Sequence, residues 1–150
     1  MKIAEALQER SDLNKKISYL KQSLEQNALH QDGELPAEDP KDTLEELNSV
    51  IDRFEKLMSM INLTNAKTVV DGKTITEWIA KRDSLQIKFS AYDKLIHAAS
   101  NVTYRASGRE IKIVSSVDVK ALRKIHDSIG KEIRTVDNLI QKNNWDTDLL

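Results

Sequence analysis

The 150-residue chain contains no cysteine, only two prolines and only four glycines. Without cysteine, disulfides, thiolate zinc sites and thiol catalysis are excluded. No apolar run approaches the roughly 20 residues that a membrane-spanning helix needs. Few helix breakers, together with 31% charged and 39% apolar residues, are typical of long helices with solvated outer faces. We therefore expect an all-α protein, and at this length one domain over residues 1–150.

Neither sign of charge dominates, because the chain contains 23 basic and 24 acidic residues. We therefore expect no nucleic-acid partner and no membrane contact. The first ten residues carry charges where a signal peptide would need an apolar core, which favours a cytoplasmic protein. A local excess of four positive charges runs from Arg105 to Arg134, and we interpret it as an ordinary solvated face rather than a nucleic-acid ribbon. Its basic residues include Arg105, Arg109, Lys112, Lys120, Arg123 and Lys124.

Helical periodicity is clear in the first half of the chain. One pattern runs from about Lys2 to His30, and the glycine and prolines of residues 33–40 end it. A second helix should begin with Asp39 as its N-cap and Pro40 in its first turn, and end before the Asp71–Gly72 turn. Its apolar stripe alternates steps of three and four residues, as in a coiled coil. The stripe consists of Leu44, Leu47, Ile51, Phe54, Met58, Ile61 and Asn65.

The second half predicts two more helices. Thr74 and Glu77 form a capping box that opens the third, and Ser115 and Asp118 form another that opens the fourth. Gly130 beside the fourth stripe predicts a close approach of two helices. Short turns make neighbouring helices antiparallel, so we expect one antiparallel bundle of four long helices. Helices shared between subunits remain an alternative.

A strand period occurs in only one segment, and we predict a β-hairpin over residues 102–114, between the third and fourth helices. Folding the chain at Ser107–Gly108 gives one apolar and one polar face. An isolated hairpin is marginal in water, so the apolar face must pack on the bundle or on another subunit. We therefore predict an oligomer interface at Val102, Tyr104, Ile111 and Ile113.

Polar residues interrupt the apolar stripes toward the bundle end opposite that hairpin. They predict a ligand site formed by Arg10, Asn62, Asn65, Arg82 and Asp83. A buried guanidinium must be paired, so either a carboxylate meets each arginine or an anionic ligand does. Our first interpretation is that these residues set helix register and oligomeric state.

No pattern of catalytic residues, and no motif for a metal or a cofactor, occurs in the sequence. Asp93 and His97 lie four residues apart, but two such groups do not make a metal site. Paired Glu-x-x-His motifs, phosphate-binding loops and nucleophile elbows are also missing. We expect no catalytic residue, no metal and no cofactor, and lean against an enzyme.

Several short runs in a fixed order resemble a known family. They include Arg10–Leu13, Pro36–Pro40, Ile61–Asn65, Val114–Val119 and Asn144–Leu149. Together they resemble the septicolysin-like family of small uncharacterised bacterial proteins. That resemblance implies an all-helical cytoplasmic protein of unknown activity. Its label hints at a cytolysin, which nothing in this sequence supports.

The sequence as a whole therefore favours a non-enzymatic helical protein that acts as an oligomeric scaffold or by binding a partner. A homo-oligomer is the expected assembly. The alternative is a protein that binds a small molecule or anion at the predicted arginine and asparagine site.

Overall fold

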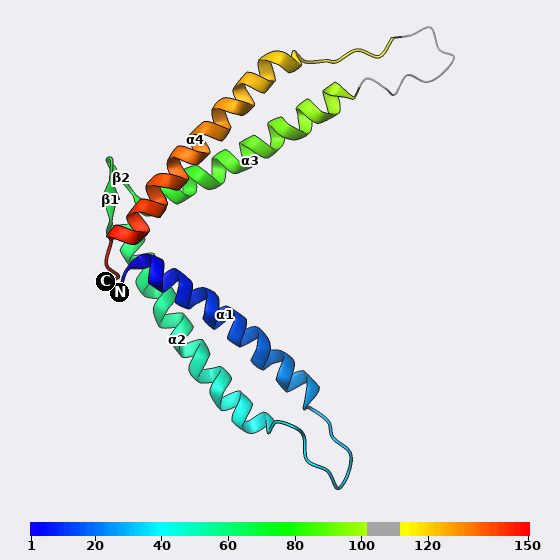
Figure 1. Ribbon diagram of the computed structural model, residues 1–150, viewed down its shortest axis with the longest axis vertical. Coiled ribbons are helices and arrows are strands. Elements are labelled where there is room, and N and C mark those ends of the chain that lie inside the picture. The colour runs from blue at the N-terminus through cyan, green and yellow to red at the C-terminus, as the bar shows by residue number, and fades with distance from the viewer. Residues whose placement is uncertain (102–111) are drawn as a thin grey trace. The chain divides into compact units, whose positions relative to one another are not determined.

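A computed structural model describes residues 1–101 and 112–150 (Figure 1). The prediction of an all-α protein with four long helices is confirmed. A two-stranded antiparallel hairpin lies between the second and third helices. The elements are α1 (Ile3–Gln26), α2 (Pro40–Lys67), β1 (Val69–Val70), β2 (Lys73–Thr74), α3 (Ile75–Ser100) and α4 (Val119–Asp146).

Two of the predicted helix starts are confirmed in atomic detail. The side chain of Asp39 accepts a hydrogen bond from the backbone N–H of Lys41, with Pro40 in the first turn of α2. Thr74 and Glu77 form a complete capping box at α3. α1 ends at Gln26, four residues before His30, because the side-chain amide of Asn27 turns back to the carbonyl oxygen of Ser23.

The predicted start of α4 is wrong by three residues. The hydroxyl group of Ser115 donates to the carbonyl oxygen of Val117 and so closes a local turn instead of capping a helix. Asp118 caps the helix, because its carboxylate accepts from the backbone N–H of Ala121 at 3.0 Å.

The turn between β1 and β2 was recognised in the sequence, but its two short strands were missed. Asp71 and Gly72 both have positive φ, 49° and 78°, as a two-residue hairpin turn requires. The hairpin predicted over residues 102–114 lies mostly outside the described residues, and so do Val102, Tyr104 and Ile111 of the predicted interface. Ile113 is described and is 50% exposed.

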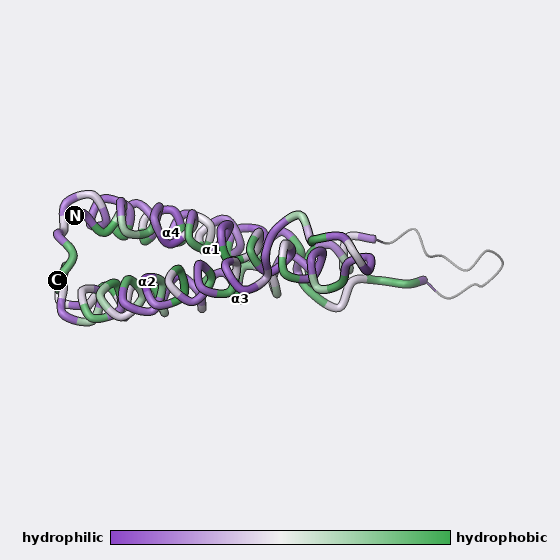
Figure 2. The backbone as a smooth tube through the Cα atoms, turned by 90° about the horizontal axis from the view of Figure 1, so that it is seen from below, coloured by the Kyte–Doolittle hydropathy of each residue, from purple (hydrophilic) through white to green (hydrophobic). Residues whose placement is uncertain are grey.

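The chain divides into two compact units. Unit 1 comprises Met1–Val70 and Asn143–Leu150, and unit 2 comprises Asp71–Lys142. In unit 1, α2 returns antiparallel to α1, since Arg53 pairs with Glu9 and Glu46 with Lys16. The single domain over residues 1–150 stays a prediction. Figure 2 shows hydrophobic residues recurring between hydrophilic ones along each helix, as amphipathic helices require.

The end of unit 1 that holds both termini contains its best-buried core. Ala6, Leu57 and Ile61 are almost completely buried there, and Leu149 packs against them. The C-terminal residues form an antiparallel bridge beside the start of α1, where the Ile3 N–H donates to the Thr147 carbonyl oxygen at 3.0 Å.

In unit 2, Gly130 of α4 lies against the Phe89 side chain of α3, and a close approach of the two helices stays a prediction. A Cβ atom at this position would lie 3.3 Å from Cε2 of Phe89. The Phe89 ring is itself stacked on His126, with ring centroids 4.0 Å apart. A larger side chain at position 130 would therefore have to displace an aromatic pair.

Gly130→Leu is expected to lower the free energy of unfolding by about 1–3 kcal/mol, because overpacking at this contact strains both helices. Chemical denaturation monitored by circular dichroism measures the change. Ser128→Leu, at an exposed position of the same helix, is the matched control and should unfold close to wild type. Equal stability of the two variants would show that the helices do not touch at Gly130.

Candidate functional site

Arg82 and Asp83, two residues of the predicted ligand site, pair with each other in unit 2. The Arg82 Nη2 atom lies 2.8 Å from Oδ1 of Asp83, and Nη1 lies 3.7 Å from Oδ1 of Asp137 on α4. Two carboxylates of the same unit therefore already face this guanidinium group. The interpretation that Arg82 sets the register of the helices stays a prediction, and this pairing is compatible with it.

The other three residues of the predicted site lie in unit 1 and are not all neighbours. Glu9 pairs with Arg53, which places Arg10 about ten residues, or about 15 Å, along the helices from the level of Asn62. Asn62 is exposed, whereas Asn65 is half-buried, and its Oδ1 atom has no hydrogen-bond partner among the residues that the structure describes. The half-buried Arg10 forms no ion pair with any described residue.

His126 is the most enclosed of the three histidines. Its Nε2 atom lies 3.3 Å from Oδ1 of Asp93, and its Nδ1 atom lies 3.7 Å from Oδ1 of Asp127. Asp93, considered beside His97 in the sequence, thus lies beside His126. No group of three or more metal-ligating side chains occurs within residues 1–101 and 112–150.

A polar pocket of about 300 Å³ lies where α1 meets the following loop. Glu38 in the loop accepts hydrogen bonds from the hydroxyl groups of Ser23 and Tyr19, and its backbone N–H donates to Asn27. The hydrogen bond from Tyr19 to the Glu38 carboxylate raises the pKa of Tyr19. Each of these bonds ties the loop to the end of α1, so the cluster has a structural use.

One flank of unit 1 is closed by ion pairs. The Arg53 guanidinium binds the Glu9 carboxylate with two hydrogen bonds, of 2.6 and 2.9 Å. Further along the same flank, Lys16 Nζ lies 2.6 Å from Oε1 of Glu46. We call this side of the α1–α2 pair the ion-pair flank. Its charged groups are exposed to water and already paired with each other.

The pairing of Glu9 with Arg53 makes stability depend on pH. The Arg53 hydrogen bond lowers the pKa of Glu9 below its ordinary value of 4.5, and a contact with Lys2 likewise lowers the pKa of Asp148. These carboxylates therefore stabilise the fold above the unfolded-state pKa, and the contribution is lost as pH falls through the lowered folded-state value.

Stability is thus expected to decline as pH falls below about 4.5, and Glu9→Gln should make that decline shallower. Urea denaturation at a series of pH values between about 2 and 6 measures the dependence. Glu25→Gln is the matched control, because it removes an exposed carboxylate of the same helix that forms no ion pair with a described residue, and it should leave the decline unchanged. An unchanged slope in Glu9→Gln would show that the Arg53 pair does not form in solution.

The opposite side of the α1–α2 pair is apolar and only partly covered. Leu44, Ile51 and Met58 are spaced by seven residues and so form a line along α2. Leu44 is 48% exposed and Ile51 is 41% exposed, whereas Met58 is half-buried. Helical periodicity places Arg10 and Ile17 of α1 on the same side. We call this side the apolar flank.

The contrast between the two flanks is the strongest feature of unit 1. Within the predicted coiled-coil stripe, Leu47 and Ile61 are buried against α1, but Leu44 and Ile51 are not. A pair of helices has only one contact line, so a stripe this wide exceeds what one neighbour can cover. The apolar flank is therefore the best candidate functional surface in this unit.

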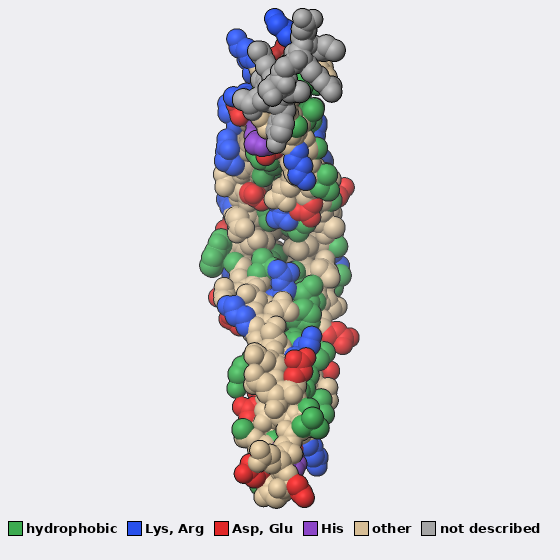
Figure 3. Space-filling view, turned by 90° about the vertical axis from the view of Figure 1, so that its right-hand side faces the viewer, with side chains coloured by type: hydrophobic (Ala, Val, Ile, Leu, Met, Phe, Trp, Pro, Cys, Tyr) green, Lys and Arg blue, Asp and Glu red, His purple; other side chains and the backbone are tan. Residues whose placement is uncertain are grey.

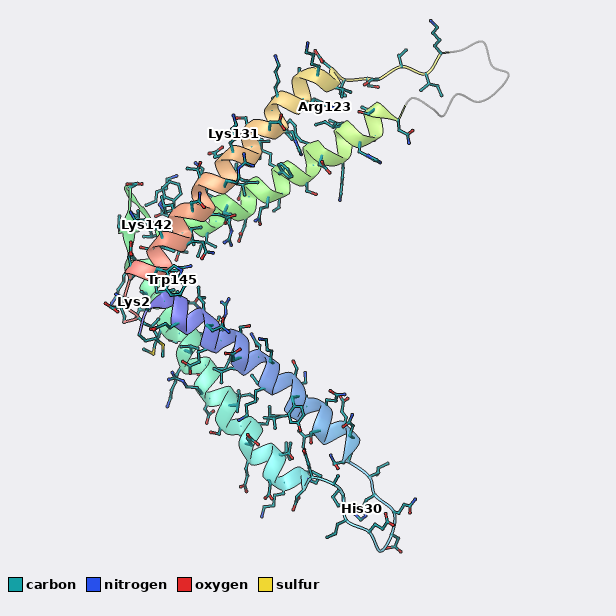
Figure 4. The ribbon with its side chains drawn as sticks, in the orientation of Figure 1. Lys2, His30, Arg123, Lys131, Lys142 and Trp145 are labelled. Carbon is teal, nitrogen blue, oxygen red and sulfur yellow. The ribbon has the colours of Figure 1, made fainter. Side chains whose placement is uncertain are left out.

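Unit 2 differs from unit 1 in charge. It contains 14 basic and nine acidic residues, a net charge of +5, whereas unit 1 contains nine basic and 15 acidic residues, a net charge of −6. Figure 3 shows Lys and Arg side chains over the part of the molecule that holds α3 and α4. Figure 4 labels three of them along α4, namely Arg123, Lys131 and Lys142.

Comparison with known proteins places the chain among relatives of unknown function. A family model described as a family of unknown function, DUF6847, matches residues 10–149. A crystal structure of a functionally unknown conserved protein from Corynebacterium diphtheriae is similar over 100% of this chain and 99% of that one, with 36% sequence identity and a TM-score of 0.94. No curated protein matches the chain. None of these findings bears on the septicolysin-like resemblance, which stays a prediction.

The part of the chain that the structure describes contains no helix long and apolar enough to cross a membrane.

Proposed function

We propose that this chain, which belongs to the DUF6847 family of unknown function, is a non-enzymatic helical scaffold that assembles with further copies of itself. The observation that carries the proposal is the apolar flank, where Leu44 and Ile51 are 48% and 41% exposed. Covering aliphatic side chains of this size stabilises an assembly by about 25 cal/mol for each Å² of apolar surface removed from water.

The ion-pair flank supports the same proposal by contrast. Its charged groups, Glu9, Lys16, Glu46 and Arg53, are paired within the chain. A surface of this kind is well hydrated and would lose favourable solvation in an interface. One side of the α1–α2 pair is thus suited to water and the other to a protein partner.

The proposal predicts that polar side chains on the apolar flank dissociate the assembly. In the double variant Leu44→Gln and Ile51→Gln, we expect the mass in sedimentation velocity to fall to that of the 17.1 kDa chain. Glutamine is a good helix former, so the helix content measured by circular dichroism should not change. Ile87→Gln, at a 74% exposed position on α3, is the matched control and should leave the mass as in wild type.

An oligomer that persists in the double variant, with wild-type mass and helix content, would exclude the apolar flank as its interface. A wild-type protein that sediments only as a monomer would exclude the scaffold itself.

The alternative function is anion binding, and Arg10 favours it, because its guanidinium group forms no ion pair with any described residue. A half-buried arginine without a carboxylate partner gains from a bound anion. Inorganic phosphate and sulfate should then raise the melting temperature of the wild type but not of Arg10→Ala. Sodium chloride at the same ionic strength is the control, and an equal rise in chloride or in the variant would reject a specific site.

A further inference from the structure

The apolar flank of α2 has an acidic border. Glu45 directly follows Leu44 in the sequence, and Asp52 directly follows Ile51, so two carboxylates lie seven residues apart beside the apolar line. Glu55 lies one turn further along the same side. All three side chains are exposed, and none forms an ion pair with a described residue.

α4 in unit 2 has an exposed apolar position with a border of the opposite sign. Ile125 is 42% exposed, and Lys124 directly precedes it. Lys131 follows Lys124 by seven residues, and Lys142 lies on the same side three turns later. All three lysines are exposed, and none pairs with an acidic residue in the described parts of the chain.

The line through Ile125 continues to Leu139, which is half-buried, and passes through Glu132 halfway between them. Glu132 would not repel an acidic partner strongly, because its charge is already neutralised within unit 2. The Nζ atom of Lys81 on α3 lies 2.7 Å from Oε1 of Glu132. The basic border of α4 therefore keeps its full charge, whereas the acidic residue within the line is neutralised by its own unit.

From these complementary borders, we propose that α2 of one copy docks on α4 of a second copy. The carboxylates Glu45 and Asp52 then face Lys124 and Lys131, at the same seven-residue spacing. Two copies related by a twofold axis make this contact twice, so the assembly closes as a dimer. The net charges of −6 and +5 on the two units favour pairing unlike units over pairing like ones.

This inference rests on the proposed self-assembly and adds which surfaces meet. It predicts that reversing either border weakens the dimer. The acidic border is reversed by Glu45→Lys, Asp52→Lys and Glu55→Lys, and the basic border by Lys124→Glu, Lys131→Glu and Lys142→Glu. Each triple variant alone brings like charges together at both contacts, and its dimer dissociation constant should rise about 100-fold.

Mixing the two variants provides the decisive measurement. A chain with reversed α2 and a chain with reversed α4 meet each other with opposite charges at both contacts, so the mixture should form a mixed dimer with nearly wild-type affinity. Sedimentation velocity with a fluorescent label on one chain measures that affinity, and circular dichroism checks that each variant is folded. If both triple variants dimerise as tightly as the wild type, or if their mixture does not associate, the α2–α4 contact is wrong, but self-assembly is not excluded. A monomeric wild type would overturn both.

Discussion

Leu57→Ala is expected to lower the free energy of unfolding by about 2–5 kcal/mol. The Leu57 side chain has no exposed surface and packs with Ala6 and Ile61 between α1 and α2. Its truncation removes buried apolar surface and leaves a cavity that two rigid helices cannot readily close. Urea denaturation followed by circular dichroism measures the change.

Ile87→Ala is the matched control. Ile87 is 74% exposed on α3, so its truncation should change the free energy of unfolding only slightly. A Leu57→Ala protein as stable as this control would mean that the core of unit 1 is not formed as described.

Removal of residues 147–150 should destabilise unit 1 by about 3–5 kcal/mol, because several contacts are lost together. Leu149 no longer covers the buried cluster of Ala6, Leu57 and Ile61. Backbone hydrogen bonds with Ile3 and Met1 are also lost, and so is the bond from the N–H of Leu150 to Oγ1 of Thr64. Thr64 is only 1% exposed. Thermal unfolding of the shortened protein tests this prediction.

Asp148→Asn separates the contribution of charge from that of packing. It weakens the contact with Lys2, whose Nζ atom lies 2.9 Å from the Asp148 carboxylate, but keeps the backbone bonds and Leu149. It should unfold near the wild-type temperature. If the shortened protein is no less stable than Asp148→Asn, the C-terminal segment does not hold unit 1 together.

Local signals in the sequence predicted the helices well. Capping by Asp39 and by the Thr74–Glu77 pair depends on residues within one turn, so it can be recognised without a structure. A contact of Gly130 with α3 was also indicated by one small residue beside an apolar stripe. Where a local pattern failed, at Ser115, a competing local hydrogen bond to Val117 explains the failure.

Contacts between distant residues could not be predicted in the same way. The bridge between Lys2 and Asp148 joins the two ends of the chain, and a tail of polar residues gave no sign that it would form. Arg10, Asn62 and Asn65 were grouped by their level along straight helices, whereas the register set by the Glu9–Arg53 pair separates Arg10 from the asparagines.

The residues of the apolar flank could be recognised in the sequence as part of one stripe, but their exposure could not. Leu44, Leu47 and Ile51 continue one stripe, and periodicity alone does not say which of them a single neighbouring helix can cover. The charged neighbours of the stripe carried a further signal, since Glu45 and Asp52 repeat at the same interval as Lys124 and Lys131. Only the burial of each side chain separates the exposed line from the core.

The mass of the wild-type protein in solution tests self-assembly most directly. Sedimentation equilibrium over a wide range of protein concentration should give twice the 17.1 kDa of the chain at high concentration, and approach 17.1 kDa on dilution. A constant mass of 17.1 kDa across the whole range would contradict the proposal that the apolar flank is covered by a second copy.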